Sequence, residues 1–167
     1  CAASTHPTEE SFCGMTHLNL KKKYKNILTI IIPRHINRAK IIEKQLTKLN
    51  LKVVFNNNLN QVDSSTDVIL VDSYGETSKF YNISKCVFLG GSLIKHGGQN
   101  PIEPSRLNCK IFHGPNISNF NEIYDYLKSL GVANKINNIE ELTQSLVEEF
   151  NSKQLDNSLT IKKINDY

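Results

Sequence analysis

The sequence predicts an α/β protein, a Rossmann-like domain built on a doubly wound parallel sheet. Short apolar runs alternate along the chain with longer segments of helical periodicity. These runs contain few polar residues, which is typical of parallel strands that helices cover on both faces. The chain has 167 residues, enough for one domain with a sizeable core, and no repeat or low-complexity linker divides it.

The first half of the chain supplies most of the predicted sheet. Residues 2–4 are expected to end a strand, and a helix follows from about residue 7 to residue 24. After a strand at 27–32, apolar residues at 39, 42, 46 and 49 predict a helix over 36–49. The other elements of this half are strands at 53–55, 68–71 and 86–89, a polar loop at 56–65 and a short helix at 79–83.

The second half continues the alternation. Its predicted elements are a helix at 101–107, a strand at 110–112, a turn at Gly114-Pro115, a helix at 121–130, an edge strand at 133–136 and a helix at 139–150. Gly131 stands where a helix commonly ends. We therefore expect residues 1–150 to form the Rossmann-like domain, and residues 151–167 to form a polar tail that frays or packs as a return helix.

The composition is that of a globular protein, with 39% hydrophobic and 22% charged residues. No apolar run reaches the ~20 residues of a membrane helix. The net charge is +4, but lysines 21–23 and 25 fall at a predicted helix end without alternating aromatic residues, so we expect no nucleic-acid binding. The four cysteines form no ligand pattern, which fits a reducing, cytosolic compartment. Because the chain opens inside a predicted strand, we expect a fragment that lacks an N-terminal part.

The most informative segment follows the strand at 86–89. Two glycine pairs, Gly90-Gly91 and Gly97-Gly98, allow sharp turns and the close approach of a ligand. Asn100-Pro101-x-Glu103 then predicts a helix start, with Asn100 at the N-cap and Glu103 completing a capping box. Free backbone N–H groups at such a place favour an anion, and first of all a phosphate. The alternative is a tight strand-to-helix turn in which Glu103 only satisfies the backbone of Asn100.

Three further polar segments follow predicted strands and therefore belong to the same edge of the sheet. Ser4 and Thr5 precede a helix, where their hydroxyls either donate to a phosphate or cap the helix. Arg34 either binds a phosphate or carboxylate in a bidentate manner or is a solvated loop residue. Tyr74 and Gly75 offer an aromatic face and backbone groups to a nucleobase, unless they belong to a simple Asx turn. Together these segments predict a nucleotide or sugar-nucleotide site.

Motifs of several other enzyme classes are missing from the sequence. There is no GxSxG elbow around any serine, no GxxxxGK[ST] phosphate loop and no GxGxxG fingerprint. A serine hydrolase, a P-loop ATPase and a dinucleotide-dependent oxidoreductase therefore have little support.

In order and spacing, the polar segments resemble the 3-deoxy-D-manno-octulosonic acid (Kdo) transferases, glycosyltransferases of the GT-B fold in lipopolysaccharide biosynthesis. Thr8 stands where this family usually has Gly, and Gln99 stands where it usually has His. The matching motifs are Ala2-Ala3-Ser4-Thr5-His6-Pro7-x-Glu9-Glu10, Pro33-Arg34-His35, Asp72-x-x-Gly75-Glu76, Gly90-Gly91-Ser92, Gly97-Gly98-x-Asn100-Pro101-x-Glu103, Gly114-Pro115 and Asn119-Phe120.

The resemblance implies that the chain is the C-terminal, donor-binding domain of a GT-B enzyme. Such enzymes transfer Kdo from CMP-Kdo to a lipid A precursor at the cytoplasmic face of the bacterial inner membrane, with no metal or other cofactor. The catalytic base, the acceptor site and the membrane anchor are implied to lie in an N-terminal half, so this chain alone is expected to bind nucleotide without turnover. The implied donor-binding residues are Ser4, Thr5, Arg34, Tyr74, Gly75, Gly90, Gly91, Gly97, Gly98, Asn100 and Glu103, with Glu103 accepting hydrogen bonds from the ribose hydroxyls.

His6, His35 and His96 are also expected to line the cleft. Two alternatives stay open at this point. One is a GT-B transferase or epimerase that uses a UDP-sugar, and the other is a catalytically inactive nucleotide-binding fragment.

Overall fold

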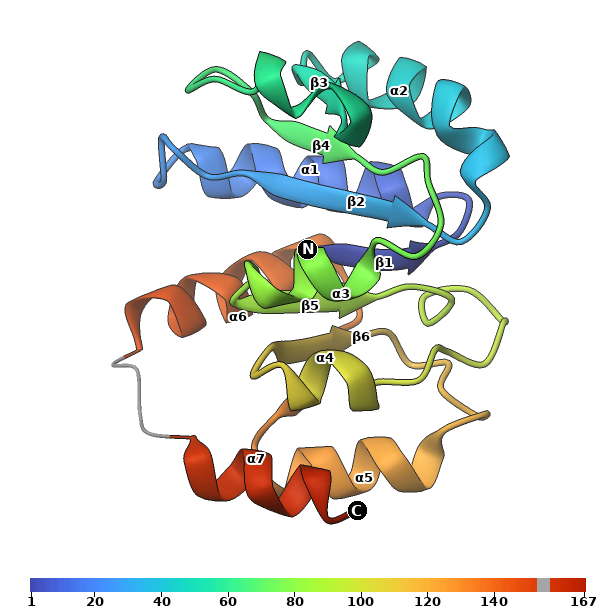
Figure 1. Ribbon diagram of the computed structural model, residues 1–167, viewed down its shortest axis with the longest axis vertical. Helices are drawn as coiled ribbons and strands as arrows, with labels where there is room; N and C mark the ends of the chain where they lie inside the picture. The colour runs from blue at the N-terminus through green and yellow to red at the C-terminus, as the bar shows by residue number, and fades with distance from the viewer. Residues whose placement is uncertain (153–156) are drawn as a thin grey trace.

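The computed structural model describes residues 1–152 and 157–167, which form a single seven-stranded sheet flanked by helices (Figure 1). All paired strands are parallel, in the order β3-β4-β2-β1-β5-β6-β7. The strands are β1 (Ala2–Thr5), β2 (Thr29–Pro33), β3 (Val53–Phe55), β4 (Val68–Leu70), β5 (Cys86–Leu89), β6 (Lys110–His113) and β7 (Ala133–Lys135). The predicted doubly wound, Rossmann-like α/β fold is confirmed.

Helices cover both faces of the sheet. In Figure 1, α3 and α4 lie in front of it, while α1 and α6 lie behind it. The face behind the sheet carries α1 (Glu9–Lys21), α2 (Ala39–Lys48) and α6 (Ile139–Asn151). The opposite face carries α3 (Thr77–Asn82), α4 (Ile102–Arg106), α5 (Asn121–Ser129) and α7 (Ser158–Asn165).

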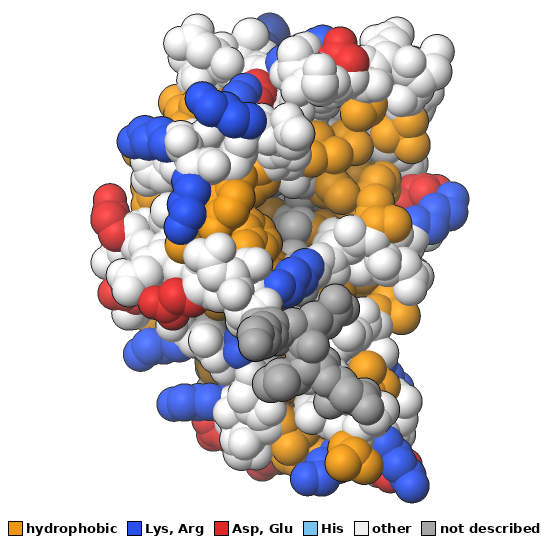
Figure 2. Space-filling view, turned by 90° about the vertical axis from the view of Figure 1, so that its left-hand side faces the viewer, with side chains coloured by type: hydrophobic (Ala, Val, Ile, Leu, Met, Phe, Trp, Pro, Cys, Tyr) orange, Lys and Arg blue, Asp and Glu red, His pale blue; other side chains and the backbone are white. Residues whose placement is uncertain are grey.

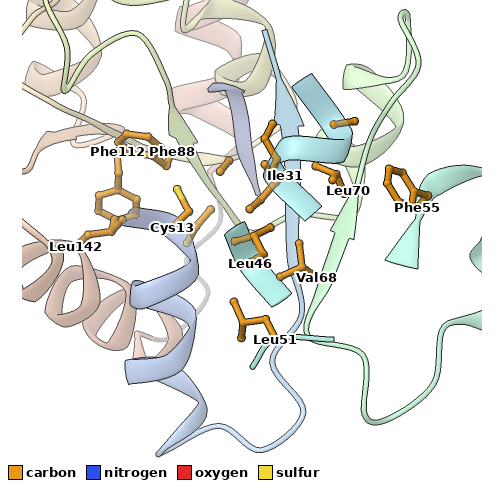
Figure 3. Packing of buried hydrophobic residues seen from close by; sticks show 14 of the residues in the cluster. Cys13, Ile31, Leu46, Leu51, Phe55, Val68, Leu70, Phe88, Phe112 and Leu142 are labelled. Carbon is orange, nitrogen blue, oxygen red and sulfur yellow. The ribbon is translucent and has the colours of Figure 1, made fainter. Parts of the chain in front are cut away.

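Each face of the sheet has its own hydrophobic cluster, because successive strand residues point to opposite sides. Cys13 of α1, Leu46 of α2 and Leu142 of α6 pack on strand residues such as Ile31 and Phe88 (Figure 3). The other cluster joins the alternate strand residues to the helices in front. Strands buried on both faces explain why the apolar runs contain so few polar residues.

Element boundaries differ from the predictions mainly where short 3₁₀ turns intervene. The predicted helix over 36–49 divides into η1 (Ile36–Arg38) and α2, and the predicted polar loop over 56–65 contains η2 (Asn56–Gln61). The segment 157–167 packs against the domain through α7, where Ile164 is buried. Residues 153–156 of the predicted tail lie outside the described residues.

The start of α1 differs from the prediction in an informative way. The helix begins at Glu9 rather than near residue 7, and neither Ser4 nor Thr5 caps it. Thr8 occupies the cap position with a φ of 81° and without a side-chain capping bond. A positive φ is strained for a β-branched residue, because its Cβ crowds the backbone.

A buried polar network ties α1 to the amino ends of the central strands. The His17 ring lies 2.9 Å from the Thr29 hydroxyl and 3.2 Å from an Asp67 carboxylate oxygen. Lys21 also donates to Asp67, whose second oxygen accepts the Lys52 backbone N–H at 2.8 Å. Burial lowers the pKa of His17, and its bond to Asp67 only partly opposes that shift. Burial also acts to raise the pKa of Asp67, but these hydrogen bonds outweigh it and leave the pKa lowered.

Among the described residues, none of the helices has both the length and the apolar character needed to cross a bilayer.

Candidate functional site

The predicted site residues gather at the carboxyl edge of the four neighbouring strands β4, β2, β1 and β5. The arrowheads of these strands lie on one side of the sheet in Figure 1. The chain moves outward from β1 to β2 and β3, returns to place β4 between those two strands, and then crosses to the other side of β1 to form β5. This change of direction makes the gap between β1 and β5 the topological switch point, where ligands bind in open α/β sheets.

The Glu9 carboxylate occupies the anion-binding position that the glycine-rich loop was predicted to offer a ligand. Its two oxygens accept the backbone N–H groups of Gly91, Ser92 and Leu93 at 2.7, 3.1 and 3.0 Å, and that of His6 at 2.9 Å. Glu9 is fully buried. The expectation that these N–H groups are free for a phosphate is therefore wrong, because the chain supplies its own anion.

A second buried carboxylate fixes the end of β1. Glu10 accepts a hydrogen bond from the Thr5 hydroxyl at 3.1 Å and two from the Arg38 guanidinium at 2.7 and 3.2 Å. The hydroxyl hydrogen of Thr5 is thus committed within the protein, and its side chain is fully buried. Nothing in the local sequence marks Arg38 or Glu9 for these roles, because Arg38 binds a carboxylate 28 residues away and Glu9 binds a backbone N–H 82 residues away.

The glycines at this edge are required mostly by contacts within the protein. A Cβ at Gly90 would lie 2.4 Å from the Ser4 carbonyl oxygen, and one at Gly97 would lie 2.4 Å from the Asn119 side chain. Gly91, Gly97 and Gly98 have φ values of 65°, 97° and 78°, which other residues rarely adopt. The predicted sharp turns are confirmed, but the close approaches at Gly90 and Gly97 are to the chain itself.

Two predicted residues, Arg34 and Tyr74, have exposed side chains at this edge, and Ser4 is half-buried beside them in the fold. Arg34 is exposed, with no ionic or hydrogen-bonding partner for its guanidinium among the described residues, and its backbone N–H donates to Thr5 at 2.9 Å. Tyr74 is 70% exposed, next to the exposed Gly75. Ser4 has a φ of 53°, where β1 slips in register against β2. The exposed side chains of Arg34 and Tyr74 are therefore free to meet a ligand.

The start of α4 corrects the predicted capping box. The N-cap residue is Pro101 rather than Asn100, although the Asn100 side-chain oxygen accepts the Ile102 backbone N–H at 3.0 Å from one residue earlier. Glu103 does not return to the Asn100 backbone; its carboxylate accepts a hydrogen bond from the Ser78 hydroxyl instead. Glu103, Asn100 and Ser78 line a surface cavity of about 400 Å³ with Arg106. The carboxylate therefore faces an open space beside α3 and α4 rather than its own helix end.

The histidines of three loops meet at the switch point. The His6 ring centre lies 4.3 Å from that of His96 and 5.9 Å from that of His35. His6 is 7% exposed, whereas His35 and His96 are exposed. Burial lowers the pKa of His6, and the neighbouring His96 and His35 lower it further. No group of three His, Cys, Asp or Glu side chains in residues 1–152 and 157–167 could hold a metal ion.

An apolar hollow of about 260 Å³ opens at the other end of the strands. Figure 2, which looks at the amino ends, shows apolar side chains around this hollow. Leu20, Leu28, Cys86 and Phe150 contribute to its walls. None of the predicted donor-binding residues lines it, so its chemistry is separate from that of the carboxyl edge.

Known proteins resemble this chain in both sequence and fold. No protein-family model matches the chain. It is 35% identical over 154 residues to a 3-deoxy-D-manno-octulosonic acid transferase of Haemophilus influenzae, and 31% identical over 153 residues to one of Aquifex aeolicus. The chain is a relative of the Kdo transferases. It spans 36% and 42% of the length of these two relatives, and the alignments cover 92% of this chain.

The fold comparison agrees with this relationship. The crystal structure of the C-terminal CMP-Kdo binding domain of WaaA from Acinetobacter baumannii matches 98% of this chain and 82% of that chain. The TM-score is 0.83 and the sequence identity is 26%. The resemblance to the C-terminal half of Kdo transferases, first stated from short motifs, is confirmed.

The two departures from the Kdo transferase pattern have different settings. Thr8 has the positive φ of 81°, which explains why glycine suits this position. Gln99 lies near the histidines, since a Cβ at Gly91 would be 2.9 Å from His96 and 3.3 Å from the Gln99 amide nitrogen. The first departure therefore concerns backbone strain, and the second concerns the lining of the switch point.

Proposed function

We propose that this chain is the donor-binding part of a Kdo transferase and binds CMP-Kdo at the carboxyl edge of β4, β2, β1 and β5. The observation that carries the proposal is the near-complete match of the fold to a domain named for binding CMP-Kdo. The polar loops of this chain gather at the same edge as its topological switch point, where such folds hold nucleotides.

Each part of a cytidine nucleotide has a partner of suitable chemistry in this arrangement. The exposed guanidinium of Arg34 has the charge to bind the phosphate. Ser4, Gly98 and Asn100 complete the proposed phosphate site. The exposed Tyr74 ring, next to Gly75, suits stacking on the base. Glu103 suits the ribose hydroxyls, because it faces an open cavity and its present partner, Ser78, is a single hydroxyl. Gly90, Gly91, Gly97 and Thr5 shape the loops rather than contribute side-chain donors.

The reaction that we propose for the whole enzyme is transfer of Kdo from CMP-Kdo to a lipid A precursor, at the cytoplasmic face of the inner membrane. The acceptor hydroxyl needs a base, and base, acceptor and donor must lie close together. Glu9 and Glu10 are buried and already hydrogen-bonded, so neither is suited to that role. We place the base and the acceptor site in the part of the enzyme that precedes this domain.

Calorimetric titration of the chain with CMP, UMP and UDP tests the proposed donor class. CMP is expected to bind more tightly than UMP, because the proposal requires recognition of cytosine, and UDP should gain nothing from its second phosphate. Tyr74→Ala should weaken CMP binding by about 1–3 kcal/mol if the ring stacks on the base. Ile83→Ala is the matched control, since Ile83 is also a large exposed apolar side chain, 71% exposed against 70% for Tyr74. Preference for UDP would favour an enzyme that uses UDP-sugars.

A further inference from the structure

One buried polar atom at the switch point lacks a partner. His6 Nε2 is the single buried side-chain nitrogen or oxygen in the described part of the chain that makes no hydrogen bond. Leaving such a group unsatisfied costs about 1–3 kcal/mol. An unpaired atom in a native fold therefore calls for an explanation, and a ligand that is absent from the free protein is one.

The rings around His6 are movable surface groups. His96 and His35 lie against it at ring-centre distances of 4.3 and 5.9 Å, and both are exposed. His96 and Gly97 also line a surface cavity of about 350 Å³, together with Lys95 and Asn116. Rotation of the two exposed rings would uncover Nε2 at the carboxyl edge of the sheet.

The charged and titratable groups that face His6 come from three parts of the fold. His35 and Arg38 face His6 from the β2–η1 region, and His96 faces it from the β5–α4 loop. From α1 come Glu10, which is already neutralised by Arg38, and Glu9, which accepts the His6 backbone N–H. Both carboxylates are thus satisfied within the protein.

Four other donors near β1 already bind carboxylates of the chain. Gly91, Ser92 and Leu93 donate their backbone N–H groups to Glu9, and the Thr5 hydroxyl donates to Glu10. His6 is the residue of this loop that keeps an unused, buried hydrogen-bonding atom.

We propose that His6 Nε2 donates a hydrogen bond to the phosphate of the nucleotide, and that the His35 and His96 rings turn aside when it binds. This inference rests on the proposed function, and it adds to that function a phosphate-binding residue and the uptake of a proton on binding. Burial and the two neighbouring imidazoles lower the pKa of His6 in the free protein. A bound phosphate opposes both effects, so the pKa of His6 should rise and nucleotide binding should take up a proton.

Titration of the histidine ring signals by NMR, in the free protein and with CMP or cytidine, tests the inference without a mutation. CMP should shift the His6 titration to higher pH, whereas cytidine, which has no phosphate, should leave it unchanged. Calorimetry in buffers of different ionisation enthalpy should show proton uptake with CMP at pH values near neutral. An unchanged His6 titration with saturating CMP would overturn the inference and leave the proposed function standing.

Variants locate the contact. His6→Gln should weaken CMP binding about tenfold or more, the loss of one hydrogen bond to a charged group, with little effect on cytidine. His35→Gln and His96→Gln should weaken CMP binding less than His6→Gln does, because the His35 and His96 rings only cover the site. A loss restricted to CMP-Kdo, with CMP unaffected, would assign His6 to the sugar carboxylate instead and refute the phosphate contact. If CMP does not bind the unmodified chain at all, both this inference and the proposed function fail.

Discussion

Thr8→Gly should stabilise the domain. Thr8 stands just before α1 with a φ of 81° and a ψ of −31°, its side chain is exposed, and it makes no capping hydrogen bond. The substitution removes a strained Cβ without removing a side-chain hydrogen bond. The Thr8 carbonyl oxygen still accepts the Phe12 N–H, at 3.0 Å in the present structure.

The expected magnitude is the difference between two opposing effects. A non-glycine residue in such a sparsely populated region costs about 1–3 kcal/mol. Glycine lowers stability by about 0.4–1 kcal/mol, because it increases the conformational freedom of the unfolded chain. The net gain is therefore about 1 kcal/mol, which for a domain of this size raises the melting temperature by about 2–4 °C.

Urea unfolding followed by circular dichroism measures this gain, with Thr8→Ala as the matched control. Alanine also removes the hydroxyl and the γ-methyl, but it keeps the Cβ and therefore the strain. We expect the glycine variant to be more stable than both the alanine variant and the unmodified chain. If the alanine and glycine variants are equally stable, the positive φ does not store the proposed strain.

Four other perturbations test separate parts of the argument. Arg34→Ala should weaken CMP binding by about 1.5–3 kcal/mol in calorimetry, the value of a charged hydrogen bond; unchanged affinity would make Arg34 a solvated loop residue. Glu103→Gln should weaken the binding of CMP more than the binding of 2′,3′-dideoxy-CMP, and equal losses of affinity would exclude the ribose hydroxyls as the partners of Glu103. The free energy of unfolding should fall from about pH 7.5 to about pH 5.5, since the unfolded His17 gains a proton below its ordinary pKa of 6.5 while the folded ring has a lowered pKa. His17→Gln should flatten that slope, and an equally steep slope in the variant would refute the assignment. Incubated with CMP-Kdo and a lipid A precursor, the chain alone should release no CMP above background, and robust transfer would move the catalytic base into this domain.

The succession of strands and helices could be predicted from the sequence, because each kind of element has its own periodicity of apolar residues. Ile30, Ile31 and Ile32 point to alternate faces of a sheet that is covered on both sides, so all three are apolar. The spacing of Ala39, Ile42 and Leu46 follows the one side of α2 that faces the core. Because parallel strands joined by helices have few acceptable topologies, the same pattern predicted which loops share an edge.

The assignment of the polar groups at that edge was decided only by the tertiary structure. Glu9 and Gly91 are 82 residues apart in the chain, and nothing in a single sequence marks one as the hydrogen-bond partner of the other. Glu103 lies three residues from Asn100, the spacing of a capping box, yet its carboxylate bonds to Ser78 on a neighbouring helix. Local spacing predicts local bonds, but a carboxylate takes the donors that the packed chain brings within reach.

The sequence by itself therefore determined the fold class, the edge that carries the site and the family to which the chain is related. The structure decided which groups at that edge are already satisfied and which are available. Gly91, Ser92 and Thr5 donate to two internal carboxylates, whereas the exposed Arg34 guanidinium and the buried His6 Nε2 have no hydrogen-bonding partner among the described residues. The physical reason is that secondary structure depends on neighbours along the chain, whereas hydrogen-bond satisfaction depends on neighbours in space, which the sheet brings together from separate segments of the chain.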